Sequence, residues 1–128
     1  MMPPNNKKFT LGRRIRSFKY AFKGLLHLIR EEPNARIHFV AGIIAIICGW
    51  YFDIDKSEWL AVILCIGIVF TTEILNTAVE NICDYISPTY HHKIKIIKDL
   101  AAAAVLISAL MSVVIAVYIF GPKLLAIL

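Results

Sequence analysis

Two glutamates and an asparagine lie inside an otherwise apolar part of the sequence. Glu73, Asn76 and Glu80 fall within residues 59–82, and Asp84 follows directly after them. An ionised carboxylate in the hydrocarbon of a membrane costs at least about 2.5 kcal/mol, so acids in such segments are functional by default. Carboxylates transfer protons and bind hard cations such as Mg²⁺, and these are the chemistries we expect here.

The spacing of these polar residues places them on one side of a helix. Steps of three, four and four residues link Glu73, Asn76, Glu80 and Asp84. The four side chains therefore point within roughly 100° of one another around an α-helix. A continuous polar face is predicted to run from the end of the apolar segment into its interior.

A second group of candidate residues lies outside this segment. Lys98 and Asp99 open the next apolar segment, and Glu32 precedes the first one. Phosphoryl transfer needs an aligned nucleophile, a metal on the phosphate oxygens and cations for the developing charge. Glu32, Glu80, Glu73 and Lys98 would supply these groups, although the chain has no GxxxxGK[ST] loop, GxGxxG or HRD-type loop.

Two other classes of protein compete with a phosphotransferase. One is a small proton- or cation-coupled transporter in which Glu73 and Glu80 titrate. The other is a membrane scaffold whose polar face serves only contacts between chains. The Lys98–Asp99 pair beside the acids favours an enzyme, because neither alternative needs that pair.

The composition requires an integral membrane protein. Of the 128 residues, 59% are hydrophobic and only 18% are charged, against about a quarter charged in soluble domains. Residues 33–52, 59–82 and 100–120 approach the roughly 20 apolar residues of a membrane span. Residues 10–30 place apolar side chains every three or four positions, which predicts an amphipathic surface helix. We expect one all-α domain, residues 1–128, with three transmembrane helices and this surface helix.

The basic residues predict the orientation in the membrane. Nine of the 14 Lys and Arg residues precede or begin the first span, and Lys93, Lys95 and Lys98 lie between the second and third. Only Lys56 and Lys123 lie on the other side. The positive-inside rule then places a retained N-terminus and the second loop in the cytoplasm and the C-terminus outside. Because the positive charge follows the spans, we expect no nucleic-acid partner.

The histidines and cysteines receive no chemical role from the sequence. His27 and His38 flank the start of the first span, while His91 and His92 are adjacent and cannot form the i, i+4 pair of a helical metal site. Hydrogen bonding at the membrane interface is the expected role of these histidines. The three cysteines lie in or beside the spans and are expected to pack as small apolar side chains.

Two long motifs resemble the prokaryotic diacylglycerol kinase family. They are EILNTAVENICD, residues 73–84, and KDLAAAAVL, residues 98–106; FKYAFKGL in the surface helix and Glu32 with Arg36 extend the similarity over most of the chain. The resemblance implies ATP-dependent phosphorylation of diacylglycerol or undecaprenol at the cytoplasmic face of the bacterial inner membrane. It also implies a homotrimer with active sites between subunits. The residues of these motifs resemble the branch associated with undecaprenol phosphorylation more than the enteric diacylglycerol branch.

The same resemblance assigns roles to individual residues. Glu73 would be the general base for the lipid hydroxyl, and Glu32 and Glu80 would hold the Mg²⁺ of MgATP. Asn76 would orient groups around the nucleotide. The remaining positions that match nucleotide-contacting residues of the family are Arg13, Tyr20, Tyr90, His91, Lys98 and Asp99.

Overall fold

The computed structural model describes residues 8–128, which form four helices and no strands. These are α1 (Leu11–Glu31), α2 (Pro33–Tyr51), α3 (Lys56–Ile86) and α4 (His92–Ile127). Each of the last three is long and apolar enough to cross a membrane. The predicted all-α class, with an N-terminal amphipathic helix before three apolar ones, is confirmed. The expected retained N-terminus, with Lys7, lies outside the described residues.

Local sequence signals explain where the helices begin. The Thr10 side chain caps α1 by accepting a hydrogen bond from the Arg13 amide at 3.3 Å. Pro33 opens α2 at a position where a backbone N–H has no helical partner in any case. Asp55 and Glu58 form a capping box at the start of α3, each side chain accepting from the other's backbone amide. The short connections between helices are therefore encoded locally.

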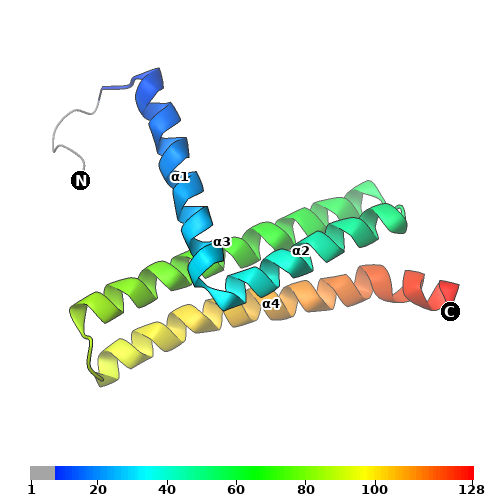
Figure 1. Ribbon diagram of the computed structural model, residues 1–128. Coiled ribbons are helices and arrows are strands. Elements are labelled where there is room, and N and C mark those ends of the chain that lie inside the picture. The colour runs from blue at the N-terminus through cyan, green and yellow to red at the C-terminus, as the bar shows by residue number, and fades with distance from the viewer. Residues whose placement is uncertain (1–7) are drawn as a thin grey trace.

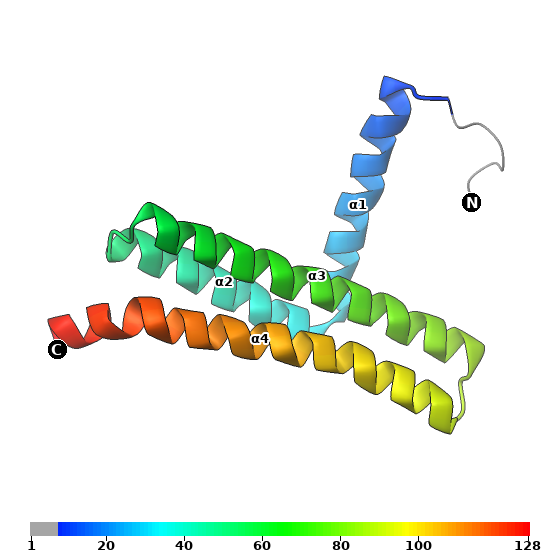
Figure 2. The same cartoon turned by 180° about the vertical axis from the view of Figure 1, so that it is seen from behind.

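The last three helices form a bundle, and α1 projects from it as a crosswise arm (Figures 1 and 2). The longest helices, α3 and α4, run antiparallel and make the most extensive interhelix contact, while α2 lies along α3. From the start of α2, α1 leaves the bundle steeply, and α3 and α4 continue past this junction. We name the two ends of the bundle by their connections: the turn end, residues 52–55, and the loop end, residues 87–91.

The last two helices are longer than the predicted spans of residues 59–82 and 100–120. With 31 and 36 residues, α3 and α4 are about 46 and 54 Å long, against about 30 Å of membrane hydrocarbon. Both remain helical beyond their apolar segments at the loop end, because no glycine or proline interrupts residues 73–86 or 92–100. The polar face of α3 is therefore carried on one continuous helix out of the apolar region.

Close packing at two places fixes α2. At the turn end, Gly49 is buried against Trp59, and a Cβ at residue 49 would lie 2.6 Å from the indole ring. At the other end of α2, Leu28 and Ala35 are buried, and α1 contacts both α2 and α3. These contacts set the register of α2 along α3, which decides what lies opposite Glu73.

Candidate active site

Glu73 is the most deeply buried charged side chain among the described residues, with 2% of its surface exposed. It lies on α3 on the same face as Val69 and Thr77, both also buried. His38, the α2 residue opposite Glu73, is five positions after Pro33, so the acid lies about 7.5 Å along the bundle from the α1–α2 junction. Glu73 is therefore near the level at which the amphipathic helix α1 leaves the bundle.

His38 on α2 contacts Glu73, and the sequence did not predict this pair. Its Nε2 atom lies 3.1 Å from Oε1 of Glu73. Oε1 accepts no hydrogen bond of standard geometry from the described residues, so the two side chains are paired by this close approach alone. The available sequence signal was a histidine and an acid near the same end of two adjacent antiparallel helices. That signal was insufficient because the pairing depends on helix register.

Asn76 and Glu80 follow Glu73 on α3 and contact each other. The Asn76 amide donates to Oε1 of Glu80 at 3.3 Å. The amide oxygen of Asn76 and the hydroxyl oxygen of Thr77 are enclosed and have no hydrogen-bond partner among the described residues. With Oε1 of Glu73, three buried oxygen atoms are thus left without a donor. Buried oxygens of this kind are costly unless a ligand, ion or water satisfies them.

Glu32 occupies the junction between α1 and α2. Its backbone caps both helices, whereas its side chain makes no capping hydrogen bond. The carboxylates of Glu32 and Glu80 are close enough to repel a charge on Glu73, and His38 attracts it. The three predicted acids are therefore brought near one another. Among residues 8–128, however, no three acidic, histidine or cysteine side chains are close enough to hold a metal together.

Lys98 and Asp99 lie at the loop end, away from Glu73. Nζ of Lys98 is 2.6 Å from Oδ1 of Asp84, the last acid of the polar face. Asp99 instead pairs with Lys95, one turn earlier on α4, also at 2.6 Å. Asp84 is eleven positions after Glu73 on α3, a distance of about 16 Å along the helix. One chain therefore brings Lys98 to the polar face but not to its deepest acid.

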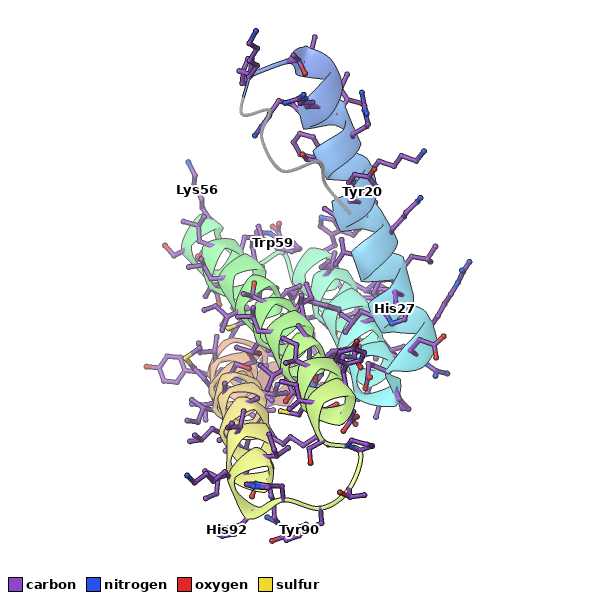
Figure 3. All side chains as sticks on the ribbon, turned by 90° about the vertical axis from the view of Figure 1, so that its left-hand side faces the viewer. Tyr20, His27, Lys56, Trp59, Tyr90 and His92 are labelled. Carbon is purple, nitrogen blue, oxygen red and sulfur yellow. The ribbon has the colours of Figure 1, made fainter. Side chains whose placement is uncertain are left out.

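The remaining predicted residues lie on two separate parts of the molecule. Tyr90 is exposed in the loop, and His91 caps α4 by accepting from the Lys93 amide at 3.2 Å. Arg13 and Tyr20 lie on α1, where the Lys23 ammonium is 5.9 Å from the Tyr20 ring. Figure 3 shows Tyr20 on the arm, well away from Tyr90 at the loop. Within one chain these residues do not meet at Glu73.

The arrangement has the parts of a phosphoryl-transfer site at a membrane boundary. A buried acid, Glu73, lies where a proton could be taken from an apolar substrate. Asn76 and Glu80, further toward the loop end, offer oxygen atoms, which are the ligands that Mg²⁺ requires. Lys98, where this face ends, offers a cation for phosphate.

Comparison with known proteins gives the same family as the motifs. Residues 19–120 match the family described as prokaryotic diacylglycerol kinase. A protein of Bacillus subtilis named undecaprenol kinase is 37% identical over 123 residues, covering 96% of this chain and 100% of that protein. Diacylglycerol kinases of Escherichia coli K12 and a Synechocystis strain are 33% and 32% identical, each over 88% of this chain and over 91% and 65% of their own lengths.

These matches decide between the classes left open by the sequence. The lipid kinase assignment is confirmed, and the transporter alternative gains no support. Together with the three helices able to cross a membrane, the matches identify a multi-pass bacterial membrane protein. The chain belongs to the prokaryotic diacylglycerol kinase family.

Proposed function

We propose that this chain transfers the γ-phosphoryl group of ATP to the hydroxyl of a membrane lipid alcohol, with undecaprenol preferred over diacylglycerol. The observation that carries the substrate preference is the full-length match to the relative named undecaprenol kinase, which exceeds the identity to the relatives named diacylglycerol kinase. Both alcohols present a hydroxyl at the headgroup plane, so the reaction itself is the same for either substrate.

Glu73 is the general base of the proposed reaction. The lipid oxygen attacks the γ-phosphorus, its proton passes to the Glu73 carboxylate, and the bond to the β,γ-bridging oxygen breaks to release ADP. The depth of Glu73 supports this role, because it lies about 7.5 Å along the bundle from the α1–α2 junction. A lipid hydroxyl is confined to this depth, whereas a base further out would face water.

The oxygen atoms beside Glu73 fit a divalent cation. The enclosed amide oxygen of Asn76 has no hydrogen-bond donor among the described residues, and carboxylate and amide oxygens are the ligands that Mg²⁺ prefers. In this proposal Glu32 and Glu80 hold the Mg²⁺ of MgATP, while Asn76 keeps Glu80 in place through its amide. When bound, the ion would neutralise charge on the phosphates.

The loop end faces the cytoplasm in this proposal and binds the nucleotide. Lys98 leaves its ion pair with Asp84 and contacts a phosphate of the nucleotide instead. Asp99 keeps the neighbouring backbone and Lys95 in place. Tyr90 and His91 contact the nucleotide from the loop. Arg13 and Tyr20, on α1, contact nucleotide or lipid and need not belong to the same chain as the Glu73 that they serve.

We further propose that the functional unit is a homotrimer with active sites shared between subunits. This proposal is supported by the position of Lys98. Its partner Asp84 lies about 16 Å along α3 from Glu73. One chain leaves these groups apart and leaves many large apolar side chains exposed on α2, α3 and α4. A neighbouring subunit that placed its own loop end or α1 over Glu73 would complete the site.

The test is a competition assay with the purified protein in detergent micelles. Undecaprenol and diacylglycerol are supplied at equal concentration with γ-labelled ATP and Mg²⁺, and the extracted lipids are separated. The proposal expects labelled undecaprenyl phosphate in excess of labelled phosphatidic acid. An excess of phosphatidic acid would reverse the substrate preference, and the absence of any labelled lipid would refute the kinase activity.

A further inference from the structure

We propose that His38 is a positioning residue that holds the Glu73 carboxylate and sets which of its oxygen atoms faces the substrate. The inference rests on the proposed kinase reaction but adds a residue to which no role has been given. Its basis is the 3.1 Å contact between Nε2 of His38 and Oε1 of Glu73.

The burial of Glu73 explains why such a partner is needed. The Glu73 side chain is 3% exposed and that of His38 is 23% exposed. A buried carboxylate is strongly destabilising unless a charged or hydrogen-bonding group faces it. In the part of the chain that the structure describes, His38 is the one basic side chain within ion-pair distance of this acid. His38 is thus the more accessible member of the pair, at 23% exposure against 3% for Glu73.

The two oxygen atoms of Glu73 are in different surroundings. Oε1, which faces His38, is fully enclosed. Oε2 is not among the enclosed unpartnered atoms of the described residues and accepts no hydrogen bond from them. Holding Oε1 therefore presents Oε2 outward as the proton acceptor. A 3.1 Å contact without a standard hydrogen bond is compatible with this role, since catalytic hydrogen bonds are often long or misaligned without substrate and tighten when it binds.

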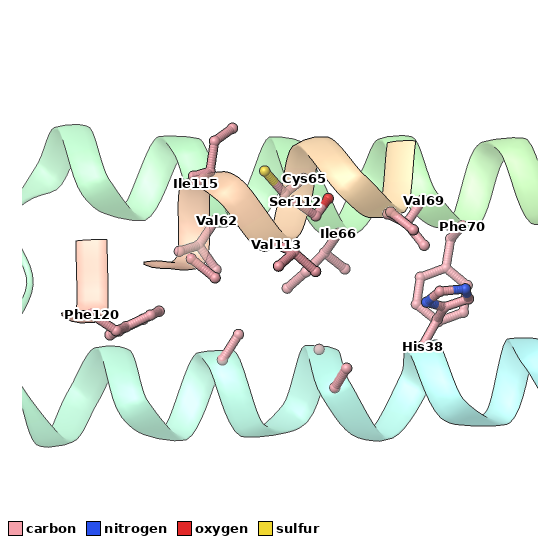
Figure 4. A pocket seen from close by; sticks show the side chains of 15 residues that line it. His38, Val62, Cys65, Ile66, Val69, Phe70, Ser112, Val113, Ile115 and Phe120 are labelled. Atoms are coloured by element: carbon pink, nitrogen blue, oxygen red, sulfur yellow. The ribbon is translucent and has the colours of Figure 1, made fainter. Parts of the chain in front are cut away.

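The surroundings of His38 are largely apolar. The ring lies beside Phe70 at one end of a cavity of about 200 Å³, and Phe120 lies at the other end (Figure 4). Apart from His38, Ser112 is the only polar side chain among the described residues that line this cavity. Such walls strengthen a polar contact and limit rotation of the ring. A carboxylate held in this way loses less orientational freedom before the reaction.

A purely structural role for His38 makes a different prediction. If the histidine only fills space or satisfies the buried acid, its replacement lowers the stability of the fold and the yield of active enzyme. Turnover per correctly folded molecule would then stay the same. If His38 positions the base, turnover falls in the folded enzyme while the binding of ATP is retained.

Two amide substitutions separate these roles. Glutamine places an amide nitrogen near the position of Nε2, whereas the asparagine amide is too short to reach Glu73. His38→Gln and His38→Asn therefore match in polarity and differ in reach. His27→Leu on α1 is the control for loss of an exposed histidine at the same end of the bundle. For each variant, kcat and the KM values for ATP and lipid are measured, with thermal unfolding as the measure of folding.

We expect His38→Asn to lower kcat roughly tenfold to a hundredfold, the usual effect of removing a residue that orients a reactive one. The KM for ATP should stay within about twofold, because uniform nucleotide binding is not affected. His38→Gln should recover most of the kcat lost in His38→Asn, and His27→Leu should match the wild type.

Four results would overturn the assignment or its basis. An asparagine variant with wild-type kcat would exclude a positioning role, and so would a glutamine variant as impaired as the asparagine one. If neither amide variant folds, His38 is required for structure and the positioning claim is withdrawn. A wild-type protein that labels no lipid would instead refute the kinase reaction on which the inference rests.

Discussion

Nζ of Lys98 lies 2.6 Å from Oδ1 of Asp84, joining the first turns of α4 to the last turn of α3. Both residues lie near the loop end of the bundle, close to the connection of residues 87–91. The polar face of α3, which begins at Glu73, therefore ends at Asp84 in contact with the Lys98 ammonium group. In an enzyme that binds ATP here, the phosphates would compete with Asp84 for Lys98.

Replacing Lys98 tests this competition. Lys98→Ala should raise the KM for ATP and lower kcat, because the developing phosphate charge loses its cation. Lys93→Ala is the matched control, since Lys93 is an exposed lysine earlier on the same helix and is in neither of these ion pairs. Steady-state kinetics with varied ATP distinguish the two. Equal kinetic defects in both variants would indicate a general effect of charge at the loop end.

The metal requirement can be tested without assuming its geometry. Chelation of divalent ions should abolish phosphorylation, and Mg²⁺ should restore it. Glu80→Gln should raise the Mg²⁺ concentration needed for half-maximal rate, because a charged ligand is lost. Glu58→Gln at the turn end is the control, since Glu58 pairs with Lys123 far from the site. An unchanged Mg²⁺ dependence in Glu80→Gln would contradict the ligand assignment.

The close contact between Gly49 and Trp59 predicts a loss of stability. A Cβ at residue 49 would lie 2.6 Å from the ring, so Gly49→Ala should destabilise the fold by about 1–3 kcal/mol, the usual cost of overpacking. At Gly24, where no atom lies within 4 Å of the added Cβ, alanine should stabilise α1 by up to about 1 kcal/mol. Thermal unfolding in detergent measures both. A Gly49→Ala protein as stable as the wild type would disprove the tight packing.

A polar contact inside the α3–α4 pair predicts a smaller effect. The hydroxyls of Thr72 and Ser108 are 2.9 Å apart, and Ser108 also donates to its own helix. Ser108→Ala should cost about 0.6 kcal/mol, the average for such contacts between membrane helices. Ser112 donates only within α4, so Ser112→Ala should cost less in the same unfolding assay. The reverse order would show that the contact between helices contributes nothing.

The helices and the acidic face could be predicted because their signals are local. Apolar segment lengths gave α2, α3 and α4, and steps of three and four residues put Glu73 and Glu80 on one face. The ends of α3 and α4 could not be predicted from hydropathy, because helices persist beyond the apolar segments. The partner of Glu73 was missed for another reason. It depends on the register of α2, which is set at the far end by the packing of Gly49.

The loop end shows a similar limit. Lys98 was expected to lie over the acidic face, and it meets the last acid, Asp84, rather than Glu73. The short connection of residues 87–91 keeps the neighbouring ends of α3 and α4 together. A residue seven positions into α4 can then reach only the last turns of α3. The sequence spacing correctly predicted which face of α3 carries the acids. The length of the connection between α3 and α4 determines how far along that face Lys98 can reach.

The central claim is that Glu73 accepts the proton of the lipid hydroxyl. The most direct measurement is lipid phosphorylation by purified Glu73→Gln, normalised to correctly assembled protein. Loss of a general base should reduce kcat by roughly 10²- to 10⁴-fold, while assembly stays intact because glutamine has nearly the same shape. A Glu73→Gln enzyme that phosphorylates lipid at the wild-type rate would contradict the account.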